Sequence, residues 1–190
     1  GEVRTAQGDS VPGARVRLVW SGPEAVPPHQ TVTGPEGRFR FDALSVGAWI
    51  LEAEAPGHEA AARRLRASTR FRNPPVVLDL RPVGRVLARV LDPDGSPRPG
   101  ARVVLGGSGV WPPRSAETDG EGAATFEDVP PGLYALRARH GDDVARVRAT
   151  LLLDPGETRE TELRLAPGRT LALRVLDAAS GDAIEGAAVT

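Results

Sequence analysis

The chain has 190 residues, a formal net charge of −1 and 40% hydrophobic residues. The near-neutral charge argues against a nucleic-acid-binding protein, because such proteins usually carry a basic excess. The sequence contains neither Cys nor Lys, which excludes disulfides, thiolate chemistry and mechanisms that need a lysine amine, such as Schiff bases, P-loops and isopeptide cross-links.

Short aliphatic segments bounded by Gly, Pro and Asp follow one another along the chain and predict β-strands. In chain order the clearest are 86–91, 101–105, 123–126, 133–138, 144–149 and 161–165. A helix over 59–65 (EAAARRL) is not expected, because the related stretch 144–148 alternates apolar and polar residues. About seven short strands per unit, with a turn every 8–12 residues or so, predict an all-β fold of antiparallel Greek-key sandwiches.

A tandem repeat of about 85 residues organises these strands. The sequence PGARV at 12–16 recurs at 99–103 and, with changes, at 185–189. The sequence TGPEG at 33–37 corresponds to TDGEG at 118–122. Further matches at the same spacing are Phe41 with Phe126, Gly47 with Gly132, and Trp49 with Tyr134.

The phase of the repeat predicts three parts. Residues 1–82 form a sandwich whose first strand lacks roughly five residues, 83–167 form a complete sandwich, and 168–190 begin a third repeat. Two strands cannot form an independent domain, so we expect the last part to lean on the second sandwich, to be poorly ordered or to pair with another chain. The junctions 80–84 and 165–168 contain Pro and no Gly/Ser linker, which predicts a semi-rigid array.

The spaced pattern PGAxV and TDxEGxxxFxx(V/L)xxGx(Y/W)xL resembles the carboxypeptidase regulatory-like domain family. The resemblance covers nearly all of both complete units. It implies a seven-strand transthyretin-like (prealbumin-like) sandwich, related to CnaB-type surface domains. It also implies a secreted or envelope protein in which such units are accessory, adhesive or spacer modules. The chain departs from isopeptide-bearing CnaB domains because it lacks Lys, and its Arg- and Ala-rich composition resembles that of high-GC bacterial proteins.

Acidic residues beside glycines raise the question of a metal or catalytic loop. Asp119 corresponds to Gly34 in the first repeat, whereas a metal site repeated through an array should keep its ligands. The stretch 92–95 (DPDG) lacks the later oxygen ligands of a calcium loop. The stretch 140–143 (HGDD) is only loosely similar to its counterpart in the first repeat. We therefore expect turns at all three places and no metal ligands.

No catalytic constellation is evident in the sequence either. His29, His58 and His140 lack the spacing of the zinc site in carboxypeptidases. The stretch 106–109 (GGSG) is followed by Val110 where a nucleophile elbow requires Gly, so we expect a flexible loop. We predict no catalytic residues, no cofactor and no enzymatic activity.

The loop expected between the second and third strands of each unit is the candidate for binding. Each such loop carries a tryptophan near proline, Trp20 in the first unit and Trp111 in the second. Aromatic side chains on stiff loops can stack on sugar rings or anchor a protein partner. The alternative is that each Trp caps its own core. Trp49 and Tyr134 lie inside strands and are predicted to be core or sheet-face residues.

Arginines alternate with apolar residues along several strands, where outward charges oppose edge-to-edge aggregation. We expect surface ion pairs with the acids nearby, or alternatively an arginine stripe that binds acidic polysaccharide. The alternating residues are Arg15, Arg17, Arg38, Arg40, Arg64, Arg66, Arg70, Arg72, Arg146 and Arg148.

The sequence therefore predicts a non-catalytic structural, adhesive or spacer module of a secreted or cell-envelope bacterial protein. Its expected partners are other domains of the same longer chain, together with envelope proteins or polysaccharide, and not nucleic acid. The sequence has no run of roughly 20 apolar residues, so no transmembrane segment is predicted. Any signal peptide is expected upstream of Gly1. The alternative is a carbohydrate-binding module that uses Trp20 and Trp111. Such a module should expose both indoles on one side, whereas a spacer should bury them.

Overall fold

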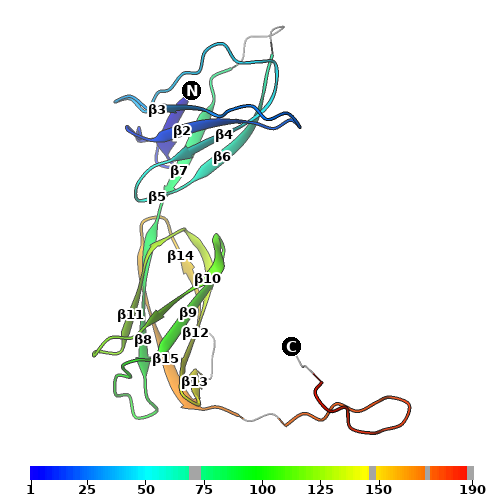
Figure 1. The fold of residues 1–190 in the computed structure, drawn as a ribbon. Helices are drawn as coiled ribbons and strands as arrows, with labels where there is room; N and C mark the ends of the chain where they lie inside the picture. The colour runs from blue at the N-terminus through cyan, green and yellow to red at the C-terminus, as the bar shows by residue number, and fades with distance from the viewer. Residues whose placement is uncertain (69–73, 146–148, 170–171, 188–190) are drawn as a thin grey trace.

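The structure is a computed structural model that describes residues 1–68, 74–145, 149–169 and 172–187. Every regular element in these ranges is a β-strand, which confirms the all-β prediction. Figure 1 shows two sandwich units arranged end to end, and the C-terminal segment runs away from the second of them. We call β1–β7 the first unit and β8–β15 the second unit.

The first unit is a sandwich of two sheets with the strand orders β1-β7-β5 and β3-β2-β4-β6. In the segment 59–65, Glu59 ends β5 and residues 61–65 belong to β6, so the expectation that it is not a helix is confirmed. The strands are β1 (Glu2–Thr5), β2 (Arg15–Trp20), β3 (His29–Val32), β4 (Gly47–Glu54), β5 (His58–Glu59), β6 (Ala61–Ala67) and β7 (Val77–Pro82).

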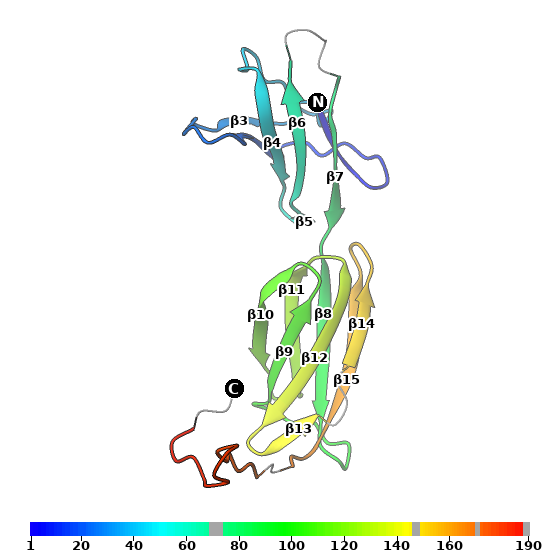
Figure 2. The ribbon, with the colours of Figure 1, turned by 90° about the vertical axis from the view of Figure 1, so that its right-hand side faces the viewer.

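The second unit is built from one eight-stranded sheet that folds over itself. One layer contains β10, β9, β12 and β14, the other contains β11, β8 and β15, and β13 joins β12 to β15. Figure 2 shows β9 and β12 lying over β8 and β11. The strands are β8 (Gly84–Leu91), β9 (Arg102–Gly107), β10 (Val110–Glu117), β11 (Ala123–Val129), β12 (Gly132–His140), β13 (Asp143–Ala145), β14 (Ala149–Leu153) and β15 (Thr158–Pro167).

Two details of the predicted strands differ from the structure. The predicted strand 144–149 is divided between β13 and β14, with 146–148 outside the described residues. Moreover, the pairing is not antiparallel throughout, because β1 pairs with β7 and β8 pairs with β15 in parallel. In both units the last strand returns beside the first after the chain has crossed to the other layer, and such a crossover allows parallel pairing.

Inward-facing side chains form two separate cores. One contains Val16, Leu18 and Trp49 of the first unit, and the other contains Phe126 and Tyr134 of the second unit. Trp49 and Tyr134 are each only 1% exposed, so the prediction of core positions for them is confirmed. The division into 1–82, 83–167 and 168–190 stays a prediction, with which the two separate cores agree.

The turn that follows the first strand occurs three times with the same backbone hydrogen bonds. Val11 N donates to Val3 O at 3.0 Å in the first unit, and Arg98 N donates to Val90 O at 2.9 Å in the second. Residues 172–187 form this turn again, although they extend away from the second unit (Figures 1 and 2). In this third turn Ile184 N donates to Val175 O at 3.0 Å, and Leu176 forms a bridge with Ala183.

Candidate functional site

Trp20, the first candidate ligand-binding residue, is packed against the core of its unit. It is the last residue of β2, so it does not lie on a loop as predicted. Its indole lies edge-on to Trp49 with ring centroids 5.0 Å apart. A Cβ built on Gly47 would lie 2.1 Å from the Trp20 ring and one on Gly22 would lie 2.3 Å from its Nε1. Trp20 therefore packs where only glycines leave room, which is typical of a structural residue.

Trp111, the second candidate, is 90% exposed. It lies on β10, an edge strand that pairs only with β9 within the described sheet, so here too the predicted loop is a strand. The register between β10 and β9 breaks between Val110 and Arg114, where the two prolines stand. The two tryptophans thus differ, since one is half-buried in the first unit and the other is exposed in the second.

The acidic turn that contains Asp119 is held by hydrogen bonds within the turn itself. Asp119 Oδ1 accepts hydrogen bonds from the amides of Glu121 and Ala123, both at 2.9 Å. The backbone bond from Gly122 N to Asp119 O recurs in the first unit as a bond to Gly34 O. The carboxylate therefore reinforces a turn that also forms without it.

The other two acidic stretches are also turns. Asp94 Oδ1 accepts hydrogen bonds from the amide and the hydroxyl of Ser96 at 3.0 and 2.7 Å. These bonds hold the pKa of Asp94 below its usual value, because they favour the charged carboxylate. His140 and Asp143 pair across the hairpin of β12 and β13. Within the described residues no group of three His, Cys, Asp or Glu side chains could hold a metal ion.

A buried threonine at the head of each turn is a feature that sequence reasoning missed. Thr118 is 6% exposed, and its hydroxyl donates to Arg98 O at 2.6 Å and accepts from Ala101 N at 2.8 Å. Thr33 makes the equivalent bonds to Val11 O and Ala14 N at 2.7 and 2.8 Å. The sequence signal for this feature was the Thr that begins both TGPEG and TDGEG. Its hydroxyl holds the backbone of the turn and is not a ligand-binding group.

The stretch 106–109 is a tight hairpin, so the expectation of a flexible loop is wrong. β9 ends at Gly107 and β10 begins at Val110. Ser108 N donates to Leu133 O at 3.0 Å, and Ser108 Oγ accepts from Leu133 N at 3.3 Å. The hydroxyl is thus engaged with the backbone of β12.

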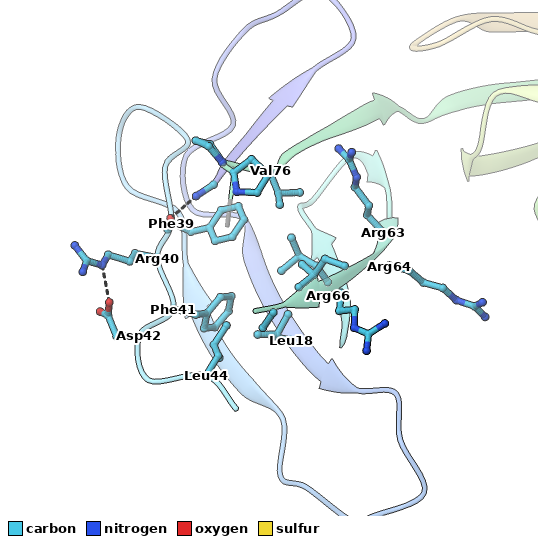
Figure 3. Close-up of a pocket in the computed structure, with 16 residues that line it drawn as sticks. Leu18, Phe39, Arg40, Phe41, Asp42, Leu44, Arg63, Arg64, Arg66 and Val76 are labelled. Carbon is cyan, nitrogen blue, oxygen red and sulfur yellow. Dashed lines mark hydrogen bonds and ion pairs between the residues drawn. The ribbon is translucent and has the colours of Figure 1, made fainter. Parts of the chain in front are cut away.

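A cavity of about 730 Å³ opens on the first unit beside β6 (Figure 3). Phe39, Phe41 and Leu44 form part of its apolar lining, and Arg40 Nε binds Asp42 Oδ1 at 2.7 Å. In the second unit the counterpart of Phe41, Phe126, is 2% exposed and pairs with Val86 of β8. Asp42 is the only acid among the described lining residues, and it pairs with Arg40. The other lining residues are Gly1, Leu18, Leu51, Arg63, Arg64, Leu65, Arg66, Ala67, Pro74, Pro75 and Val76.

Most of the alternating arginines that the structure describes lie at the surface, as predicted. Arg17 pairs with Glu52 at 3.5 Å, Arg38 with Glu36 at 3.1 Å, and Arg40 with Asp42 at 2.7 Å. Such exposed pairs contribute about 0–1 kcal/mol each. Arg70, Arg72, Arg146 and Arg148 lie outside the described residues.

Two stretches of the sequence, 1–78 and 85–166, match the carboxypeptidase regulatory-like domain. No curated protein matches the sequence significantly. No helix that could cross a membrane occurs in residues 1–68, 74–145, 149–169 and 172–187.

Several solved structures are similar to this chain. The Bacillus anthracis TIE protein has 15% identity and a TM-score of 0.41, over 86% of this chain and 33% of that one. The Streptococcal ancillary pilin has 13% identity and a TM-score of 0.49, over 87% of this chain and 61% of that one. GBS52, the minor pilin of Streptococcus agalactiae, has 14% identity and a TM-score of 0.45, over 88% of this chain and 89% of that one. The chain thus spans about a third of the length of the first protein and about three fifths of the second.

Proposed function

The chain belongs to the carboxypeptidase regulatory-like domain family, and we propose on that premise that it is a non-catalytic structural module of a secreted or cell-envelope bacterial protein. In this role it spaces and presents other domains of a longer chain. Two groups that could have been reactive support the proposal. The Asp119 carboxylate accepts hydrogen bonds from the amides of its own turn, and the Ser108 hydroxyl accepts one from Leu133 N.

The junction between the units is the observation that carries the spacer role. β7 ends at Pro82 and β8 begins at Gly84, so a single residue separates them. Val83 N donates to Gly57 O of the first unit at 3.0 Å, and Gly156 N of the second unit donates to Pro82 O at 3.1 Å. Each unit is therefore bonded to the junction, which restricts the angle between them far more than a free linker would.

Inserting Gly-Ser-Gly-Ser between Pro82 and Val83 should release this restriction. We expect small-angle X-ray scattering to show a narrow distribution of maximum dimensions for the natural chain and a broad one for the insertion variant, because Gly/Ser linkers behave as flexible coils. The same insertion beside Gly120, where the chain borders open space, is the control and should leave the distribution narrow. An equally broad distribution for the natural chain would contradict the spacer role.

Carbohydrate binding is the second candidate function, and the 90% exposure of Trp111 favours it. An exposed indole on a sheet edge offers a flat apolar surface to a sugar ring. Trp20 does not support this role equally, because it packs on Trp49 and the two glycines.

Titration with a panel of neutral plant and bacterial polysaccharides tests the role of Trp111. If the indole binds sugar, the tryptophan emission should change saturably in the natural chain, and Trp111→Ala should abolish the change while Trp20 and Trp49 still fluoresce. Because Trp111 is so exposed, this variant should melt at the natural temperature. Natural-chain emission that stays constant throughout the panel would count against the second function and leave the spacer role untouched.

A further inference from the structure

We propose that the outer face of β9 and β12 in the second unit binds a carboxylate-bearing polysaccharide through Arg102, Arg137 and Arg139. All three side chains are exposed and point to the same side of the sheet. Arg102 stands directly opposite Arg139 in the strand register, and Arg137 stands opposite Val104. The inference goes beyond the spacer role and does not depend on it.

The arrangement of these arginines is unfavourable without an anion. Like charges directly opposite each other on neighbouring strands are destabilising, and within the described residues none of the three guanidinium groups forms an ion pair. Arg102 Nη2 contacts Ser115 Oγ at 3.3 Å and Arg139 Nε donates to Gly141 O at 3.0 Å. Glu117 stands opposite Arg102 on β10. Among the described residues of β9, β10 and β12, this face therefore carries three positive charges and one negative charge.

The first unit provides an internal comparison, because the same register positions there carry balanced charges. Arg15 stands opposite Glu54, and Arg17 stands opposite Glu52. The second of these pairs is close enough for an ion pair, at 3.5 Å. The sandwich therefore does not require an unbalanced basic face at this place, and the fold forms with acids where the second unit has Arg139 and Arg137.

The basic face of the second unit is also hollowed and partly apolar. The three arginines line a hollow of about 600 Å³ together with Val104, Val144, Ala138 and Ala145. Val144 is 38% exposed, so an apolar side chain lies in the open between charged ones. Guanidinium forks bind carboxylates through paired hydrogen bonds, and the aliphatic floor can contact the C–H face of a sugar ring.

An acidic polysaccharide fits this face better than a protein or a nucleic acid. A peptide cannot add to the sheet here, because β9 and β12 already have hydrogen-bonded neighbours on both sides. The described lining residues include no aromatic side chain of the kind that anchors protein interfaces. A nucleic acid would need a wider basic field than a chain of net charge −1 provides.

The test is calorimetric titration of the whole chain with polygalacturonate, with dextran as the uncharged polymer. We expect polygalacturonate to bind and dextran not to bind. The variant Arg137→Glu/Arg139→Glu gives the second unit the acids of the first, and it should weaken binding roughly 10- to 100-fold, since each lost charged contact is substantial. Its β-type circular dichroism and melting temperature should be retained, because the new carboxylate at position 139 would stand opposite Arg102 as Glu54 stands opposite Arg15.

The reciprocal variant Glu52→Arg/Glu54→Arg is the matched control, because it builds the basic face on the first unit. It should raise the number of binding sites per chain from one to two. Unchanged polygalacturonate affinity in Arg137→Glu/Arg139→Glu would overturn the proposal, and so would equal binding of dextran. Equal affinity for poly-glutamate would also overturn it, in favour of an acidic protein partner.

Discussion

Trp49→Ala is expected to unfold the first unit and to leave the second unit folded. Trp49 is 1% exposed, its ring meets Trp20 at 5.0 Å, and its Nε1 donates to Ser45 O at 3.1 Å. Truncating a buried Trp costs about 3–5 kcal/mol, which is a large part of the stability of a small domain. Urea denaturation followed by far-ultraviolet circular dichroism should show an early transition for the first unit and an unshifted one for the second.

Two further variants serve as controls for this result. Tyr134→Ala removes the equivalent residue of the second unit, so it should reverse the pattern and unfold that unit first. Trp111→Ala removes an exposed ring and should change the free energy of unfolding by less than about 0.5 kcal/mol. A single transition that shifts as a whole in Trp49→Ala would mean that the two units unfold together, contrary to the separate cores.

The parts of the fold that could be predicted from the sequence are those that depend on local pattern and repetition. Trp49 and Tyr134 aligned in the repeat, and in the structure each polar tip donates to the carbonyl four residues upstream, Ser45 O and Pro130 O. Alternation along β12 also indicates that apolar residues face inward and arginines outward, since the side-chain period of a strand is two. Tyr134, Leu136 and Ala138 are buried as this pattern predicts, whereas the apolar Leu133 is 56% exposed.

The candidate binding residues were harder to place because prolines and tryptophans are ambiguous signals. Pro112 and Pro113 led to the prediction of a loop, but an edge strand tolerates proline, and β10 is such a strand. Trp20 is followed by Ser, Gly and Pro, which are typical of exposed loops. The contacts of its ring with Trp49, Gly22 and Gly47 show that it is packed, and these contacts cannot be derived from sequence spacing.

The basic face of the second unit was beyond sequence analysis for a related reason. Arg102 and Arg139 are 37 positions apart, and only the register between β9 and β12 places them opposite each other. A shift of one residue would send the side chains of one strand to the other face. The sequence contains the charges, whereas the pairing of charges is a property of the assembled sheet.

Thr118→Val is expected to destabilise the second unit although it keeps the shape of the side chain. The Thr118 hydroxyl is the partner of both Arg98 O and Ala101 N. Ala101 is fully buried, so its amide cannot turn to water when the hydroxyl is lost. Leaving the buried Ala101 amide and the part-buried Arg98 carbonyl without this partner costs roughly 1–3 kcal/mol. The loss should lower the urea midpoint of the second unit and leave the first unit unchanged.

Thr125→Val is the matched control, because Thr125 lies on β11 with its side chain exposed. The same substitution there should change the free energy of unfolding by less than about 0.5 kcal/mol. Thr33→Val should repeat the loss in the first unit, since Thr33 bonds Val11 O and Ala14 N in the same way. If Thr118→Val lowered the free energy of unfolding as little as Thr125→Val, the hydroxyl of the repeated threonine would not stabilise the fold. The turn that begins at this threonine would then again be a candidate for function.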